Sequence, residues 1–335
     1  MPATQTGHAN IFRLRSSSGC NGCIRVRLTI QNVYVREASF CDILARMEFY
    51  SKAAFNSLEW ITSLKDSERG ITSRILEDVE PLFTRRGLPF RLHEPQTAAD
   101  LLSTLKAIAS RASMGMKPII HLDLHGSKNT GISVEASGEA IDWPTLANGF
   151  RTINAATKCS LTVVSGACFS FHAVSAVDIT MIAPFYLMIA PEEEITGGEL
   201  EGNLAHFYRD LFEGRDIYTT MGARFGNRIR AFHCEKMLAY VFYDFINEAG
   251  VGRQKKRRIE DYVSRAVADG TGSDSETLRR LRDLAGELVK PSEELLVRHG
   301  TVFLGGRSPS FTIADLKDEV LKGRREGVKP NGRYA

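Results

Sequence analysis

The stretch LTVVSGACFSF, from Leu161 to Phe171, joins a hydrophobic run to a turn of small residues and a cysteine. β-Branched residues favour strands, and Gly166 and Ala167 end this run just before Cys168. Free cysteine is among the most often buried residue types, so packing in the core is one explanation for Cys168. The other explanation is that its thiol is displayed at the tip of a strand as a nucleophile.

Strands and helices alternate on both sides of this stretch. KPIIHLDLHG (117–126) predicts a second strand, which ends in His125 and Gly126. Apolar spacing, caps and turn residues predict further elements: a strand at 24–30, helices at 40–60 and 71–86, a strand at 88–95, a helix at 97–112, a hairpin at 131–141, a helix at 142–157, a strand at 176–183 and two helices within 198–226. Such alternation predicts an α/β fold, with a mainly parallel sheet covered by helices on both faces.

The composition is typical of a soluble globular protein. Hydrophobic residues make up 43% of the 335 positions and charged residues 25%. The longest apolar run, at 181–191, is too short to cross a bilayer and is interrupted by proline. The first twenty residues carry no secretory signal pattern. We therefore expect a cytoplasmic protein without a membrane partner.

The six cysteines do not form the dense pattern of a disulfide framework. Cys20 and Cys23 form a C-x-x-C, but a structural zinc site usually needs a second pair or closely spaced histidines. Cys41 and Cys159 lack that spacing. We expect no metal, and we expect residues 1–23 to be a flexible N-terminus.

The charge is concentrated at the C-terminal end. Residues 251–335 hold 18 Lys and Arg against 13 Asp and Glu, whereas the rest of the chain holds 25 against 27. The sequence TLRRLRDLAGELV (277–289) has apolar residues at helical spacing. These shifts predict a main domain at 24–250, followed by a basic helical extension at 251–335.

The two predicted strands at 117–126 and 160–168 end in residues that fit one chemistry. The carboxyl ends of parallel strands share one edge of a sheet, and ligands bind at that edge in α/β folds. The separation of 43 positions between His125 and Cys168 leaves room for a hairpin and one crossover helix. A histidine and a cysteine placed there form a base and a nucleophile. The glycine at 126 would let the backbone approach a substrate, and the N–H groups of Gly126 and Cys168 would form an oxyanion hole.

IIHLDLHG followed by LTVVSGAC resembles the caspase-like, clan CD cysteine peptidases. Over residues 24–245 the order of elements is most similar to the bacterial CHAT branch. The resemblance implies a three-layer caspase-like fold and a cysteine endopeptidase with a Cys-His dyad and an acyl-enzyme intermediate. It also implies a regulated bacterial protease that needs no cofactor, acts on a protein substrate and has a possible regulatory protein partner.

Departures from the family leave the substrate specificity open. Animal caspases carry a glutamine before Ala-Cys and Arg-Gly after it, whereas this chain has Gly166 before Ala-Cys and Phe169-Ser170 after it. Metacaspases carry an acid two residues before the cysteine, and that position is also Gly166 in this chain. Glu193, in the acidic run 192–194, could hold a basic P1 side chain, and Arg36 could hold an acidic one. Either residue could equally be an ordinary surface charge.

Other readings of these residues stay open. His121 and Asp123 alternate with His125 on one strand face, so the three could ligate a metal, or Asp123 could orient His125. His172, four residues after Cys168, could lie near the sulfur or be a core or surface histidine. Two other functions are possible: a catalytically silent caspase-like adaptor, or a nucleic-acid-associated protein acting through the basic segment. We expect nucleic acid not to be the main partner.

Overall fold

The structure is a computed structural model that describes residues 13–14, 26–27, 47, 49, 54–215, 217–249 and 252–325. Contacts divide these residues into two compact units. The first unit holds the described residues up to Cys234, apart from 47 and 49, together with 302–307. The second unit holds 47, 49, 235–301 and 308–325.

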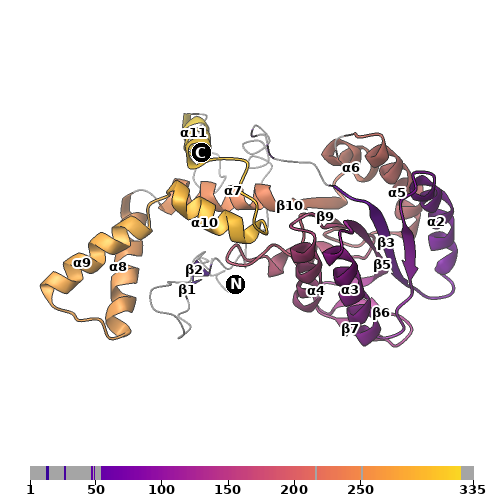
Figure 1. Cartoon of the computed structure of the whole chain (residues 1–335), viewed down its shortest axis with the longest axis horizontal. Helices are drawn as coiled ribbons and strands as arrows, with labels where there is room; N and C mark the ends of the chain where they lie inside the picture. Colours follow the sequence, from indigo (N-terminus) through magenta and orange to yellow (C-terminus); the bar gives the residue numbers. More distant parts are fainter. Residues whose placement is uncertain are drawn as a thin grey trace, which may run out of the picture. The chain divides into compact units, whose positions relative to one another are not determined.

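An eight-stranded sheet forms the centre of the first unit (Figure 1). Six strands follow the order β10-β9-β8-β5-β3-β4, and all neighbours are parallel except β10, which is antiparallel to β9. The end of β5 also pairs with β6, and β6 pairs with β7, both antiparallel. The strands of this sheet are β3 (Ser57–Ser63), β4 (Phe90–His93), β5 (Pro118–Ser127), β6 (Gly131–Val134), β7 (Glu139–Ile141), β8 (Thr162–Ser165), β9 (Leu187–Pro191) and β10 (Ile229–His233). A separate two-stranded pair joins β1 (Arg13–Leu14) and β2 (Val26–Arg27).

Helices cover both faces of this sheet. They are α2 (Arg69–Thr84), α3 (Ala98–Ser113), α4 (Trp143–Ala156), α5 (Gly197–Phe212), α6 (Ile217–Phe225) and the 3₁₀-helix η1 (Ser170–Ala176). Helix α3 packs against α4, and α2 packs against α5, with the two pairs on opposite sides of the strands (Figure 1). This three-layer α/β arrangement with a mainly parallel sheet confirms the predicted fold class.

Burial explains why the central strands lack a simple alternation of apolar and polar residues. All seven residues of β3 are buried, as expected for a strand with helices on both faces. The flanking helices begin at the predicted caps. The Thr97 side chain accepts a hydrogen bond from the Asp100 N–H at 3.1 Å, and the Asp142 side chain accepts one from Thr145 at 2.7 Å.

Two predicted elements are wrong. The helix predicted at 40–60 would include residues 57–60, but these begin strand β3, because a short strand buried on both faces has no distinguishing period. The strand predicted at 176–183 is absent: η1 ends at Ala176, and the next element in this described part of the chain is β9, which begins at Leu187. Val177 and Ile179 are buried without joining the sheet, and β9 takes the place beside β8.

The secondary-structure elements described in the second unit are all helices, joined by turns. Its elements are α7 (Cys234–Asp244), the π-helix η2 (Phe245–Ala249), α8 (Gly252–Ala268), α9 (Ser275–Leu288), α10 (Glu293–Phe303) and α11 (Ile313–Arg325), of which α7 begins and α10 ends in the first unit. The helices after residue 251 confirm the predicted helical C-terminal extension. The predicted domain boundaries after residues 23 and 250 stay predictions. No helix in the described part of the chain combines the length and apolar character that a bilayer crossing requires.

Candidate active site

The structure brings the ends of β5 and β8 together at one edge of the sheet. The two strands are parallel neighbours, and their last paired residues are Leu122 and Ser165. His125 and Cys168 each lie three residues beyond that pair. The residue that the sequence predicts as the base therefore lies among the last residues of β5, and the predicted nucleophile follows the carboxyl end of the adjacent strand β8.

Gly126 is required by the close approach of the Cys168 backbone. A β-carbon at position 126 would overlap the carbonyl oxygen of Cys168 and lie 3.4 Å from its amide nitrogen. Both neighbours are backbone atoms, so no side-chain rotation could relieve the overlap. The sequence predicts that this glycine lets the backbone approach a substrate. In the structure, the bare Cα also lets the two strand ends pack against each other.

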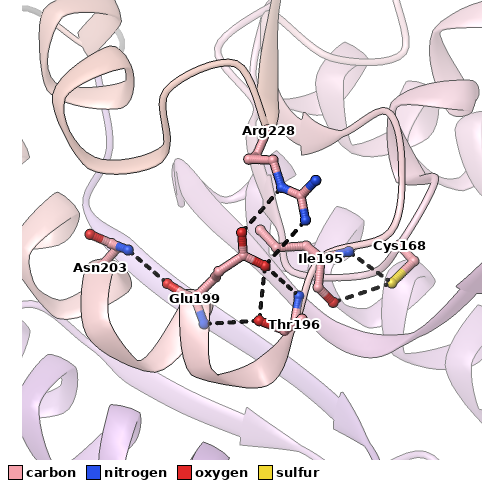
Figure 2. A network of polar contacts seen from close by, with 6 residues as sticks. All are labelled: Cys168, Ile195, Thr196, Glu199, Asn203 and Arg228. Carbon is pink, nitrogen blue, oxygen red and sulfur yellow. Dashed lines mark hydrogen bonds and ion pairs between the residues drawn. The ribbon is translucent and has the colours of Figure 1, made fainter.

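The thiol of Cys168 is half-buried, whereas Cys159 and Cys234 are fully buried. Its sulfur accepts a hydrogen bond from the Ile195 N–H at 3.4 Å and lies 3.6 Å from the Ile195 carbonyl oxygen (Figure 2). Among the cysteines in the described ranges, Cys168 is thus the one residue that is not fully buried. A backbone N–H aimed at sulfur stabilises negative charge there.

The residue after Cys168 takes an unusual backbone conformation. Phe169 is left-handed, with φ 59° and ψ 9°, which disfavours a bulky side chain. Hydrogen bonds hold this turn: the Ser170 hydroxyl donates to the Ala167 carbonyl at 2.6 Å, and the Phe169 N–H donates to the Glu193 carbonyl at 3.2 Å. Strained turns of this kind are common where a side chain must be presented.

His125 is held by a carboxylate that the sequence analysis did not identify. Its Nε2 lies 2.8 Å from Oε2 of Glu68, which also accepts a hydrogen bond from the Lys65 N–H at 3.2 Å. Partial burial alone would raise the pKa of Glu68, but the hydrogen bond and charge of His125, with smaller effects of Lys65, bring that pKa below its ordinary value. A carboxylate that accepts from Nε2–H leaves Nδ1 of a neutral imidazole as the basic nitrogen.

Asp123 does not take the orienting role that the sequence left open. It is buried, and its Oδ2 accepts hydrogen bonds from the hydroxyls of Thr62 at 3.0 Å and Thr72 at 2.7 Å. Burial raises its pKa, although the hydrogen bonds from both threonines and the charge of His125 oppose that shift.

His121 is a core residue. Its ring stacks on Trp60 with centroids 3.6 Å apart, and its Nδ1 lies 2.8 Å from the Tyr208 hydroxyl. Complete burial lowers the pKa of His121 to about 3, so this imidazole is neutral. The described residues contain no group of three or more side chains arranged to hold a metal ion. Cys20 and Cys23 lie outside the described residues.

The acidic run 192–194 lies beside the Cys168 turn. The Glu193 carbonyl accepts the Phe169 N–H, while the Glu193 side chain is exposed. Glu192 forms an ion pair with Arg230 at 3.3 Å, and Glu194 is exposed. Arg36 lies outside the described residues, so nothing places it relative to this edge. His172, in η1, is half-buried; burial and the charge of Lys128 lower its pKa, while Glu192 opposes the shift.

Neither the protein-family models nor the curated proteins contain a match to this chain. The case for a function therefore depends on the geometry at this edge of the sheet and on the two strand-end motifs.

Proposed function

We propose that the chain is a cysteine endopeptidase in which Cys168 is the nucleophile and His125 the general base. The observation that carries this proposal is the position of the half-buried residue Cys168 just beyond β8, where its backbone lies against Gly126, next to His125 near the end of the neighbouring strand β5. The order and spacing of these residues resemble the caspase-like peptidases, most of all their bacterial CHAT branch.

Acylation begins when His125 takes the proton of the Cys168 thiol. The sulfur attacks the carbonyl carbon of the scissile peptide bond and forms a tetrahedral intermediate. The N–H groups of Gly126 and Cys168 donate to its oxyanion. As the C–N bond breaks, protonated His125 gives its proton to the leaving amine, and an acyl-thioester remains on Cys168. Glu68 holds the imidazole and balances its positive charge.

Deacylation uses the same base. His125 takes a proton from a water molecule, whose oxygen attacks the thioester carbonyl. The C–S bond then breaks, the new carboxyl terminus leaves, and the proton returns to the sulfur. Every proton and electron pair in this cycle is supplied by Cys168, His125, the peptide and water, so the scheme needs no cofactor. The resemblance supports a protein substrate and a regulated protease with a possible regulatory protein partner, and the sequence pattern favours a cytoplasmic location.

The test compares the full-length wild type with Cys168→Ala on a library of peptides derived from a bacterial proteome. New amino termini are labelled and identified by mass spectrometry. We expect cleavage sites that are present with the wild type and absent with Cys168→Ala. If iodoacetamide alkylates Cys168 in the folded protein but no Cys168-dependent cleavage occurs, the peptidase assignment fails, and the silent adaptor becomes the better explanation.

Glu193 suggests a preference for a basic residue at P1. Its loop is hydrogen-bonded to the Cys168 turn, and within the described residues neither Glu193 nor Glu194 forms an ion pair. In the library experiment, sites after Arg or Lys should dominate, and Glu193→Gln should reduce that preference. An unchanged pattern of cleavage sites would remove Glu193 from the specificity pocket.

The first turns of α8 favour a second candidate function, binding of a nucleic acid. Residues 253–258 include five cations and no acid, at a helix N-terminus where positive charge is unfavourable. Arg253, Lys256 and Arg257 are exposed, without an ion pair in the described part of the chain. Helix stability does not explain this cluster, whereas a polyphosphate partner would.

Fluorescence anisotropy with a labelled 20-base-pair DNA duplex tests this candidate. Contacts to phosphates would make the affinity fall steeply with added salt, and Lys256→Glu with Arg257→Glu would abolish it. Lys290→Glu, which changes a cation on a different segment, is the matched control. Equal weak binding by both variants would exclude α8 as a nucleic-acid surface.

A further inference from the structure

The residues from Glu192 to Glu199, here called the sulfur loop, connect β9 to the first turn of α5 and include the backbone donor to Cys168. The Ile195 N–H lies 3.4 Å from the sulfur, and the next residue, Thr196, is the N-cap of α5. The position of this donor therefore depends on how α5 begins.

A complete capping box fixes the start of α5. The Thr196 side chain accepts from the Glu199 N–H at 3.3 Å, and Oε2 of Glu199 accepts from the Thr196 N–H at 2.9 Å and its hydroxyl at 2.8 Å (Figure 2). The Asn203 amide adds a hydrogen bond to the Glu199 carbonyl at 2.9 Å. Ile195 directly precedes this box, so the box fixes the direction of its N–H.

Two arginines at the start of the edge strand hold both ends of the sulfur loop. Arg228, just before β10, donates from Nε to Oε1 of Glu199 at 3.1 Å and lies 3.5 Å from Oε2 through Nη2 (Figure 2). Arg230, within β10, pairs with Glu192 at 3.3 Å. These contacts tie the sulfur loop to the edge strand, and Arg228 also neutralises a carboxylate near the sulfur.

We propose that Arg228 and Arg230 are positioning residues for Cys168: by clamping the sulfur loop, they keep the Ile195 N–H directed at the sulfur and so maintain its reactivity. The catalytic meaning of this inference rests on the proposed peptidase function. Neither arginine touches the reacting atoms. Hydrogen bonds from Thr196 and Arg228 lower the pKa of Glu199 to about 2, so its carboxylate is available to Arg228 at any pH where a peptidase of this kind would work.

The molecule offers a close control for this clamp. Arg74, on α2, makes a bidentate contact with Glu201, two residues after Glu199 on the same helix. Both pairs join an exposed arginine to a carboxylate in the first turns of α5. Only the Glu199 pair belongs to the capping box next to Ile195, so a general effect on α5 should be shared by both arginines.

The experiment measures the second-order rate of Cys168 alkylation by iodoacetamide on the full chain at pH 7, with site-specific detection by mass spectrometry. Loss of an oriented donor and of a helix cap predicts a rate about three- to tenfold lower in Arg228→Gln than in the wild type. We expect Arg230→Gln to have a smaller effect, Arg228→Lys to recover part of the rate, and Arg74→Gln to match the wild type. Thr196→Val disrupts the same box from the other side, so it should reproduce Arg228→Gln if that variant does not fold.

Equal alkylation rates in Arg228→Gln, Arg74→Gln and the wild type would overturn the clamp, whatever their melting temperatures. A thermal stability loss shared by both arginine variants, without a difference in alkylation, would show a structural role only. The two proposals fail separately. Slower alkylation in Arg228→Gln without any Cys168-dependent cleavage contradicts the peptidase, whereas Cys168-dependent cleavage that is unchanged in Arg228→Gln contradicts the clamp.

Discussion

The two ends of strand β8 each carry a cysteine, and their environments differ completely. Cys159 lies three residues before the strand, is fully buried, and has its sulfur 3.9 Å from that of Cys234, which is also buried. Cys168 lies three residues after the strand, is half-buried, and receives the Ile195 N–H. At one end of the strand the cysteine is enclosed in the core, and at the other it lies at the edge of the sheet.

This difference follows from the direction of the strands in an α/β sheet. At the amino end of β8 the chain arrives from α4, and the core closes over Cys159. At the carboxyl end the chain leaves the sheet in the left-handed turn at Phe169, so the Cys168 side chain stays at the edge. In such sheets binding sites form at the carboxyl ends. The position of each cysteine relative to the strand therefore determines whether the residue is enclosed in the core or lies at the edge of the sheet.

The largest expected effect is a difference in alkylation between the two ends. Iodoacetamide should modify Cys168 in the folded protein, whereas Cys159 and Cys234 should react at least about 10³-fold more slowly, because they react only when the structure opens. Peptide mapping by mass spectrometry over time measures all three sites in one sample. Urea-unfolded protein is the control, in which the three rates should converge. Comparable native rates at Cys159 and Cys168 would remove the distinction.

The next effect concerns the base. His125→Ala should reduce peptide cleavage by about 10²- to 10⁴-fold, the usual range for loss of a general base. His206→Ala, which removes an exposed histidine on α5, is the matched control and should retain activity. Because Cys168 and His125 act as one unit, the double variant should be no worse than Cys168→Ala alone. Residual cleavage by Cys168→Ala at the level of His125→Ala would contradict the dyad.

The sequence was sufficient for the fold class and for the two strand ends. Two kinds of local pattern predicted the structure correctly: the helix caps at Thr97 and Asp142, and the apolar runs that precede His125 and Cys168. Such patterns depend on neighbouring residues in the sequence, so they can be recognised without knowledge of the fold. Glu68 was missed for a specific reason. Residues 57–60 were predicted to be helical, so the end of β3, from which Glu68 follows, was not recognised as part of the same sheet edge.

The sequence pointed to Glu193 in the sulfur loop, but the contact of this loop with the Cys168 sulfur was missed because it is not local. The strand predicted at 176–183 would have taken the place beside β8 that β9 occupies. With β9 misplaced, no sequence pattern could indicate that Ile195 contacts Cys168 from 27 residues away, or that Arg228 reaches Glu199. The capping-box motif at Thr196 was readable in principle, since a threonine is followed three residues later by a glutamate.

Gly126→Ala should have a moderate effect on both stability and reactivity. The added methyl group would collide with the Cys168 carbonyl, and a backbone collision cannot be relieved by a rotamer change. We expect a loss of about 1–3 kcal/mol in the free energy of unfolding, with slower alkylation of Cys168. Gly202→Ala is the matched control: position 202 on α5 has open space, so alanine should be neutral or stabilising by up to about 1 kcal/mol. Equal stability of the two variants in urea titrations would show that the strand ends are not closely packed.

The smallest expected effect is the pH dependence contributed by the capping box. The pKa of Glu199 falls from 4.5 to about 2 because of its hydrogen bonds from the Thr196 N–H and hydroxyl and from Arg228. A carboxyl group with a depressed pKa in the folded state adds stability above its unfolded pKa and loses that stability as the pH falls toward the folded value.

Glu199→Gln keeps a hydrogen-bond acceptor but cannot titrate. The difference in urea midpoint between wild type and Glu199→Gln should therefore be greatest near pH 6–7 and shrink as the pH falls from about 4.5 toward 3. The same pair of measurements in the Arg228→Gln background should give a smaller difference at neutral pH, because one of the groups that lowers the pKa is gone. A difference that stays constant from pH 7 to pH 3 would mean that the Glu199 charge does not stabilise the cap, and the clamp on the sulfur loop would then depend on hydrogen-bond geometry alone.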